Sequence, residues 1–136
     1  MPQVALVVDD RPENVKKARI WLKAEGFLAE AAGSLAEAKR RVLARQSQGG
    51  YNRIISDMDL GQGILQKHRA LDGYRFVVWC RKQGVTCPIT LHSSAFSRRI
   101  RSVLLWPIRK HAERLGIQVQ AKSKIMAPPS RKFRHK

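Results

Sequence analysis

Short apolar runs alternate along the chain with longer segments in which apolar residues recur at helical spacing. The runs have the length of strands and the nearly continuous apolar character of strands buried on both faces of a parallel sheet. They lie at residues 4–8, 27–32, 54–57, 88–92 and 117–121. Helical patterns lie between them, at residues 11–25, 34–46, 74–82 and within 96–115. This alternation predicts an α/β fold, a doubly wound five-stranded parallel sheet with helices on both sides.

Proline, glycine and serine mark several ends of the predicted helices. Pro12 suits the first turn of the first helix, and Gly26 ends that helix. Ser34 can cap the second helix while Glu37 reaches back to the amide of the cap residue itself. Pro107 removes an amide from the helical pattern of residues 96–115, which predicts two helices or one sharp kink there.

The composition indicates one globular domain without a membrane span. The chain has 136 residues, of which 43% are hydrophobic and 27% charged. No apolar run is long enough to cross a membrane and the N-terminal residues do not resemble a secretion signal, so we expect a cytoplasmic protein with no membrane partner. The two cysteines, Cys80 and Cys87, are not spaced as metal ligands, and we expect reduced thiols.

The net charge of +17 is unevenly distributed along the chain. Residues 98–136 hold twelve Lys or Arg against one acid, Glu113, and so carry +11 of that charge. A basic surface of this kind attracts polyanions through phosphate contacts. Binding of nucleic acid or another polyanion through the basic C-terminal region is therefore one hypothesis for the function, and residues 127–136 are expected to form a disordered basic tail.

Polar residues with a common chemistry stand where the predicted strands end. In parallel sheets of this type the ligand site lies at the carboxyl ends of the strands. Carboxylates gathered there repel one another unless a cation intervenes, and oxygen ligands of this kind suit Mg²⁺. A carboxylate beside the ion can act as a nucleophile toward a phosphoryl group, with a lysine and a hydroxyl on the remaining oxygens. The residues in these positions are Asp9, Asp10, Asp57, Ser93 and Lys122.

The order of these residues resembles that of response-regulator receiver domains, the CheY-like family of two-component systems. The resemblance spans about residues 3–125. Its four matching segments, each ending a predicted strand, read VALVVDDRPEN, NRIISDMDL, CPITLHSS and VQAKS. It implies a flavodoxin-like sheet with the strand order 2-1-3-4-5 and a receiver domain over residues 1–126.

The resemblance also implies a role for each matching residue. Asp57 would be the phosphoacceptor and, with Asp9 and Asp10, would hold Mg²⁺, with Asp10 the closer ligand. Asp59 would offer its backbone carbonyl to the metal. Ser93 would supply the switch hydroxyl, with Ser94 nearby, and Lys122 would pair with the phosphoryl group. The Asp72-Gly73 pair resembles the one that leads into the third helix of the family.

The sequence departs from the family pattern at several points. Insertions are expected near residues 61–69 and 97–115, the first of them next to the phosphorylation site. Lys122 is followed by Ser123 where the family usually has proline. The aromatic switch residue expected shortly before that lysine is replaced by Val119 and Gln120. These changes bear on the switching mechanism and the partner surface rather than on the phosphorylation chemistry.

Three functions are compatible with this pattern. The first is a stand-alone receiver of a phosphorelay, phosphorylated by a histidine kinase or a phosphotransfer protein and not an enzyme beyond its own phosphorylation and dephosphorylation. The second is a receiver-like module that binds a polyanion. The third is a haloacid-dehalogenase-like phosphatase, which Asp57-Met-Asp59 superficially suits. That family carries its DxD motif on the first strand, whereas a strand-helix-strand-helix unit precedes it here, so we disfavour the phosphatase.

Overall fold

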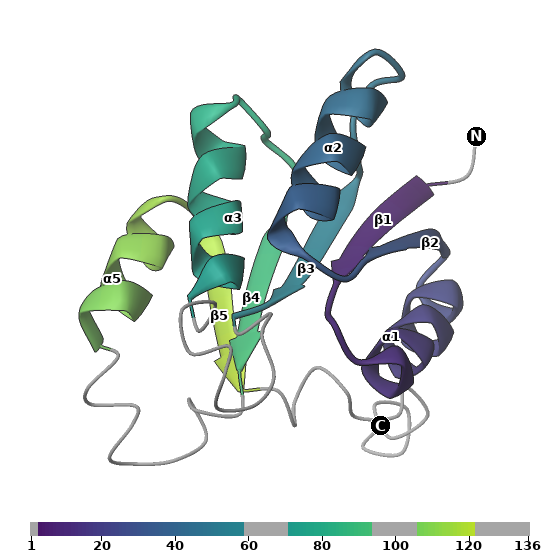
Figure 1. The fold of residues 1–136 in the computed structure, drawn as a ribbon, viewed down its shortest axis with the longest axis horizontal. Helices are drawn as coiled ribbons and strands as arrows, with labels where there is room; N and C mark the ends of the chain where they lie inside the picture. The colour runs from purple at the N-terminus through teal and green to yellow at the C-terminus, as the bar shows by residue number, and fades with distance from the viewer. Residues whose placement is uncertain (1–2, 59–70, 94–105, 122–136) are drawn as a thin grey trace, which may run out of the picture.

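Five parallel strands form the centre of the protein (Figure 1). The structure is a computed structural model that describes residues 3–58, 71–93 and 106–121. The strands follow one another across the sheet in the order β2-β1-β3-β4-β5, as the resemblance predicted. Their bounds are Gln3–Val8 for β1, Phe27–Ala32 for β2, Arg53–Asp57 for β3, Ile89–Ser93 for β4 and Ile117–Ala121 for β5.

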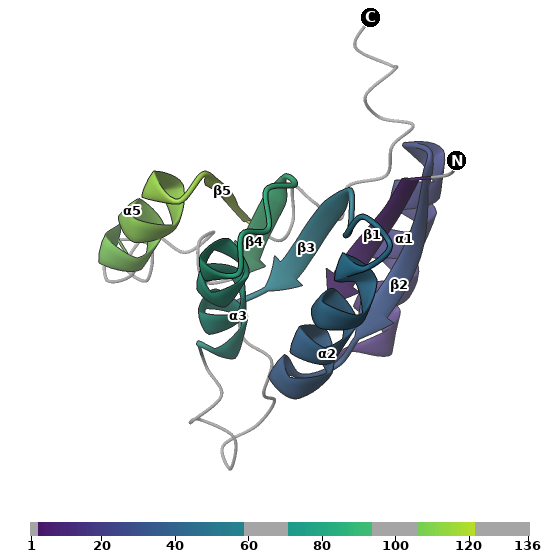
Figure 2. The ribbon, with the colours of Figure 1, turned by 90° about the horizontal axis from the view of Figure 1, so that it is seen from above.

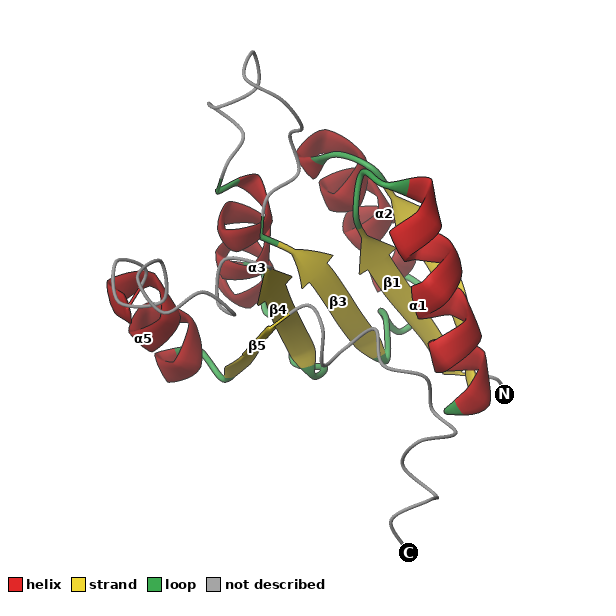
Figure 3. Cartoon of the chain, turned by 90° about the horizontal axis from the view of Figure 1, so that it is seen from below, coloured by secondary structure: helices red, strands yellow, loops and turns green. Residues whose placement is uncertain are grey.

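Helices cover both faces of the sheet, so the doubly wound arrangement is confirmed (Figures 2 and 3). Helix α1 (Pro12–Ala24) packs on one face through Ala18, Trp21 and Leu22, which contact Ala5, Val7 and Ile55 of the strands. The other face carries α2 (Leu35–Gln46), α3 (Asp72–Lys82) and α5 (Trp106–Arg114).

The core follows from the continuous apolar character of the middle strands. Successive side chains of β1 point to opposite faces of the sheet. Leu6 packs in the hydrophobic cluster under α2 and α3, and Val7 packs in the cluster under α1. Phe76 of α3 and Leu22 of α1 are completely buried on opposite sides of the sheet. Burial of one such side chain contributes about 1.5–3 kcal/mol. These two cores fix the strand ends that carry the candidate site.

The ends of α1 and α2 confirm the sequence predictions with one correction. Gly26 has φ +93°, a left-handed conformation that glycine adopts without strain, and α1 ends just before it. At the start of α2, the Ser34 hydroxyl accepts a hydrogen bond from the Glu37 amide. The Glu37 carboxylate, however, accepts from the amide of Gly33 rather than that of Ser34 (2.8 Å). The Glu37 side chain therefore holds the backbone of Gly33, the residue before the cap.

One helix start differs from the position read from the sequence, and a second helix begins next to a proline. Helix α3 begins at Asp72, two residues before the predicted start at residue 74. The Asp72-Gly73 pair, which resembles the one that leads into the third helix of the family, forms the first two residues of α3, and Gly73 packs against the end of β3. In α5, Pro107 is the second residue, where a missing amide costs nothing, so within residues 106–114 it causes no kink. Residues 96–105, the earlier part of that predicted helical stretch, lie outside the described segments.

One arginine of α3 ties the ends of three elements together. The Arg81 guanidinium donates hydrogen bonds of 2.7–3.1 Å to four backbone carbonyls. The acceptors lie in the segment before β4 and in the turn between α5 and β5, namely Val85, Cys87, Leu115 and Gly116. Backbone carbonyls outside helices and strands still need hydrogen-bond donors, and Arg81 supplies them here. The side chain thereby stabilises the edge of the sheet at which β4 and β5 begin.

Both cysteines are free thiols, as predicted. Cys80 is buried in the core under α3, and burial raises the pKa of its thiol to about 12. Burial also raises the pKa of the half-buried Cys87. Across the described segments, no helix is both long and apolar enough to span a membrane.

Candidate metal centre

The carboxyl ends of β1 and β3 lie side by side, and this brings the acidic residues together. Val8, the last residue of β1, is in register with Ser56 of β3. Asp9 and Asp10 follow Val8 directly, and Asp57 follows Ser56 as the last residue of β3. The apolar runs that form these strands are each ended by aspartate, so the sheet register itself places the carboxylates at one edge.

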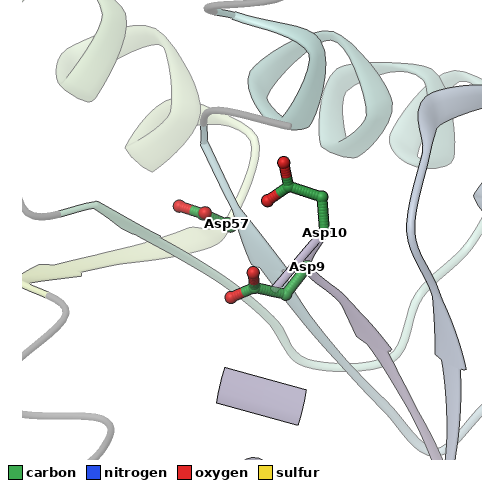
Figure 4. A group of neighbouring side chains, drawn as sticks. All are labelled: Asp9, Asp10 and Asp57. Atoms are coloured by element: carbon green, nitrogen blue, oxygen red, sulfur yellow. The ribbon is translucent and has the colours of Figure 1, made fainter. Parts of the chain in front are cut away.

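Asp9, Asp10 and Asp57 form a compact acidic cluster (Figure 4). Each residue offers a carboxylate oxygen, and these oxygens all lie within 4.8 Å of one another. Asp9 and Asp57 are only 2% and 4% exposed, and Asp10 is half-buried. Carboxylates this close repel one another, and buried ones need hydrogen bonds or a cation for compensation. The cluster is therefore arranged for a positive charge.

Backbone contacts hold Asp9 in position. Its amide donates to the carbonyl of Ala32 at the end of β2 (3.0 Å). Its side-chain oxygen Oδ1 accepts from the amide of Arg11 (3.0 Å), at the start of α1. The first contact holds the backbone of Asp9 beside the end of β2, and the second orients its side chain.

Asp57 is held by its backbone against the start of α3. Its carbonyl oxygen accepts a hydrogen bond from the buried Ser56 hydroxyl (3.0 Å). The amide of Gly73 donates to the carbonyl of Met58 (2.9 Å). Gly73 lies so close that a Cβ at this position would overlap the Asp57 carbonyl. Only glycine permits this approach, which couples the first turn of α3 to the position of Asp57.

The donor set fits a small hard cation. Mg²⁺ prefers oxygen ligands and is usually held by one or two carboxylates with water and phosphate oxygens in the remaining positions. Asp9, Asp10 and Asp57 supply three carboxylate oxygens within one ion's reach, and none of the residues in the cluster offers nitrogen or sulfur. The structure thus brings together the three side chains predicted from the sequence as magnesium ligands.

The other predicted site residues lie at or beyond the edge of the described segments. Ser93 ends β4 and its backbone is in register with Ala121, the last residue of β5. Its side chain lies outside what the structure describes. Lys122 follows Ala121 directly in the chain, and it lies outside the described residues, as do Asp59, Ser94 and the segment 61–69. Their predicted roles remain predictions.

The site also includes features that the sequence analysis missed. A hollow of about 540 Å³ lies beside the cluster, between α1, the end of β2 and the start of α2. Asp9 and Asp10 line it together with Lys16, Arg19 and Ile20 of α1. The i, i+3, i+4 spacing of these three residues could have indicated a common outward face. His92 of β4 is completely buried and in register with Asp57, and no motif of the sequence indicated that it would lie beside this residue.

The comparisons with known proteins agree with this geometry at the level of the fold. No protein-family model matches the chain, and no curated protein matches it in sequence. Many solved structures do match. A receiver domain protein from Methanospirillum hungatei JF-1 has a TM-score of 0.64 at 16% identity, covering 99% of this chain and 90% of that chain.

Two further structures give the same result. A two-component response regulator from Clostridium difficile has a TM-score of 0.62 at 20% identity, covering 98% of this chain and 91% of that chain. The chemotaxis protein CheY4 of Vibrio cholerae has a TM-score of 0.61 at 17% identity, covering 99% of this chain and 96% of that chain. Together with the strand order 2-1-3-4-5, these matches show that the chain has the flavodoxin-like fold of CheY-like response-regulator receiver domains.

Proposed function

We propose that this chain is a receiver module of a two-component phosphorelay that accepts a phosphoryl group on Asp57 in a Mg²⁺-dependent reaction. One observation carries the proposal: the carboxylates of Asp9, Asp10 and Asp57 lie within 4.8 Å of one another at the carboxyl edge of a receiver-like sheet. The phosphodonor would be a histidine kinase or a phosphotransfer protein, the partners that the fold implies.

The proposed step is an in-line displacement at phosphorus. A carboxylate oxygen of Asp57 attacks the phosphoryl group of a phosphohistidine, the new oxygen–phosphorus bond forms, and the phosphorus–nitrogen bond breaks. The departing imidazole nitrogen keeps the electron pair of the broken bond. A bound Mg²⁺ neutralises charge on the phosphoryl oxygens and orients them.

The neighbours of Asp57 have supporting roles in this proposal. Asp9 and Asp10 would hold the ion, with Asp9 oriented by the Arg11 amide. By the resemblance, Lys122 would bind a phosphoryl oxygen, Ser93 would donate its hydroxyl to another, and the Asp59 carbonyl would complete the metal ligands. The protein would catalyse no reaction other than its own phosphorylation and dephosphorylation, in the cytoplasm.

Polyanion binding through the basic C-terminal region is the weaker proposal. In the described part of that region, two cations of α5, Arg109 and Lys110, already pair with Glu113 (3.5 and 3.7 Å). Residues 122–136 lie outside the described segments, and their role in binding nucleic acid stays a prediction. A steep fall of affinity with salt would identify such binding.

Intact-mass measurement after treatment with acetyl phosphate and Mg²⁺ tests the proposed function. The wild-type protein should gain the mass of one phosphoryl group, and the gain should disappear when Mg²⁺ is chelated. Asp57→Asn should show no gain. Asp72→Asn is the matched control, because Asp72 is a buried carboxylate at the start of α3 that does not belong to the cluster. Unmodified wild-type protein would refute the proposal.

A further inference from the structure

A second hollow lies at the edge of the sheet opposite the acidic cluster, between the ends of α2 and α3. The last turn of α2, the start of β3 and the turn from α3 to β4 line it. Figure 1 shows these two helix ends on the side of the molecule away from the carboxyl ends of the strands. We call it the amino-end hollow. Its volume of about 530 Å³ is typical of sites that hold small molecules.

The amino-end hollow is open because glycines form the turns around it. Helix α2 ends at Gln46, and the chain then turns through Gly49 and Gly50, while Gly84 follows α3. The three glycines have φ values of +94°, +79° and +86°, a conformation that favours glycine over every other residue. A Cβ at any of them would meet no atom within 4 Å. The turns therefore contribute no side chain to fill the space between the helix ends.

The innermost part of the lining is apolar. Val42 of α2 is 2% exposed, and Ile54 of β3 is completely buried. Tyr51 lies between them in the lining and is 7% exposed. The half-buried side chains of Val85 and Cys87 line the opposite wall, before β4. An apolar ring placed in this hollow would lose contact with water on several sides, and its burial would be favourable.

No charged side chain among the described residues lines the amino-end hollow, although 27% of the chain is charged. The hollow beside the acidic cluster, by contrast, has both acids and bases in its lining, among them Asp10, Lys16 and Arg19. Burial raises the pKa of Tyr51 and of Cys87, so both titratable groups of the amino-end hollow stay neutral at physiological pH. A charged ligand would lose hydration there without gaining an opposite charge. The lining therefore favours an uncharged ligand.

The charged groups that touch the walls of the amino-end hollow are engaged with the protein. Arg81 donates hydrogen bonds to the carbonyls of Val85 and Cys87 (2.7 and 3.0 Å). The Glu30 carboxylate accepts a hydrogen bond from the Tyr51 hydroxyl (2.6 Å). Neither Arg81 nor Glu30 belongs to the lining itself. These contacts hold the walls in place without presenting a charge to the hollow.

Uncharged polar groups line the more open part of the amino-end hollow. They belong to Gln46, Asn52 and Thr86, all of which are exposed. The side-chain oxygen of Asn52 accepts a hydrogen bond from the Val4 amide (2.8 Å), which also fixes the direction of the Asn52 amide nitrogen. Side-chain amides and a hydroxyl both donate and accept hydrogen bonds. Beside an apolar interior, they would orient a ligand that carries an amide, carbonyl or hydroxyl group.

We infer that the amino-end hollow is a binding site for a small uncharged molecule that combines an apolar ring system with an amide, carbonyl or hydroxyl group. The ring system packs against Val42 and Ile54, and the polar group faces Asn52 and Thr86. None of the lining residues belongs to the acidic cluster. The inference therefore goes beyond the phosphorylation proposed for Asp57, and either can fail without the other.

A titration with three matched probes tests the inference. The probes 2-naphthamide, 2-naphthoate and 2-naphthamidine share one ring system and are neutral, anionic and cationic at pH 7. Two-dimensional NMR follows binding through the backbone amide signals of Gly49, Gly50 and Gly84. We expect 2-naphthamide to shift these signals with a Kd of roughly 1 mM or below. The two charged probes should bind at least about tenfold more weakly there, because the hollow offers no opposite charge.

The signal of Gly33 serves as an internal control. Gly33 lines the hollow beside the acidic cluster and not the amino-end hollow. Its amide signal should therefore stay in place when 2-naphthamide is added. A shift of Gly33 without a shift of Gly49, Gly50 and Gly84 would show that the probe prefers the other hollow and would overturn the inference.

Substitutions with tryptophan test the location independently. Gln46→Trp and Thr86→Trp each place a large ring in the lining from opposite walls, and each should weaken binding of 2-naphthamide at least about fivefold. Gln48→Trp is the matched control, because Gln48 is exposed but does not line the amino-end hollow, and it should bind within about twofold of wild type. All three positions are exposed, and far-UV circular dichroism checks that the variants fold.

Three further outcomes would overturn the inference. The first is wild-type protein whose glycine signals do not move up to the solubility limit of 2-naphthamide. The second is equal affinity of the three probes at these signals, which would show that the uncharged lining does not select the ligand. The third is wild-type affinity in both Gln46→Trp and Thr86→Trp, which would place the bound probe outside the amino-end hollow.

Discussion

Replacement of Gly73 by alanine tests how firmly the start of α3 holds Asp57, the proposed phosphoacceptor. The added Cβ would lie 1.6 Å from the Asp57 carbonyl oxygen and 2.8 Å from the Met58 Cα. Ordinary contact begins near 3.4 Å, so α3 or the end of β3 must move by about 1.8 Å, the difference between 3.4 and 1.6 Å. Both neighbours are backbone atoms, which cannot turn aside as a flexible side chain would.

The expected cost has two parts. Overpacking at a tight site costs about 1–3 kcal/mol. Separation of Gly73 from β3 also breaks the hydrogen bond from its amide to the Met58 carbonyl, and buried groups left unpaired cost about 1–3 kcal/mol. Gly73→Ala should therefore lower the free energy of unfolding by about 2–6 kcal/mol. A displacement of more than about 1 Å at a reacting group can cost 100-fold in rate, so acetyl phosphate should modify the variant far more slowly.

Urea denaturation and the rate of mass gain with acetyl phosphate measure the two effects. Gly33→Ala is the matched control, since a Cβ there would meet its nearest atoms at 4.0 Å although the residue lines the same hollow as Asp9 and Asp10. It should stay within about 0.5 kcal/mol of wild type. If Gly73→Ala unfolds within 1 kcal/mol of wild type and reacts at the same rate, the close approach of α3 to Asp57 does not position the site.

Two further predictions concern stability. Arg81→Ala removes four hydrogen bonds to carbonyls and should lower the free energy of unfolding by about 2–4 kcal/mol. The control is Lys82→Ala, which alters an exposed neighbour and should change the free energy of unfolding by less than about 0.5 kcal/mol. Equal urea midpoints for the two variants would contradict this prediction. Burial and the hydrogen bond to Glu30 raise the pKa of Tyr51, as burial raises that of Cys80 to about 12. The folded protein thus keeps protons that the unfolded chain releases from about pH 8.5 for cysteine and pH 10 for tyrosine. The free energy of unfolding should be highest below that pH range and should fall as pH rises through it. Tyr51→Phe should remove the part of this fall that occurs above pH 10. Urea midpoints that do not change between pH 7 and 11 would contradict the roles given to Tyr51 and Cys80.

The strands and the acidic cluster could be predicted from the sequence because each depends on local pattern. A buried parallel strand reads as a short apolar run, and aspartates at residues 9, 10 and 57 end two such runs. The rule that parallel strands end at a common edge then brings the three carboxylates together without knowledge of any contact. The observed register confirms that step.

The start of α3 could not be predicted in the same way. The resemblance placed Asp72-Gly73 before the third helix, but no local pattern indicates that the Asp57 carbonyl, 16 positions earlier, requires a glycine at residue 73. The contact exists only after β3 and α3 have packed together. Tertiary packing here decides where the helix begins, which local propensity does not show.

Which of the basic side chains form ion pairs also depends on tertiary contacts. From the sequence, the C-terminal third is the most basic part, and α1 and α2 look equally basic. In the structure, Glu30 of β2 contacts both Arg41 and Arg45, whereas within the described residues none of the cations of α1 forms an ion pair. Those partners are 11 and 15 positions apart, so the sequence alone could not distinguish a paired helix from an unpaired one.

A titration with Mg²⁺ followed by beryllofluoride, a stable mimic of a phosphoryl group on a carboxylate, tests the central claim most directly. Calorimetry should show one Mg²⁺ site in wild-type protein, and fluorine NMR should then show one bound beryllofluoride adduct that requires the metal. Asp10→Asn should weaken the metal site, and Asp57→Asn should abolish the adduct. An adduct that survives in Asp57→Asn, or wild-type protein that binds neither ion, would show that Asp9, Asp10 and Asp57 do not form a phosphoacceptor site.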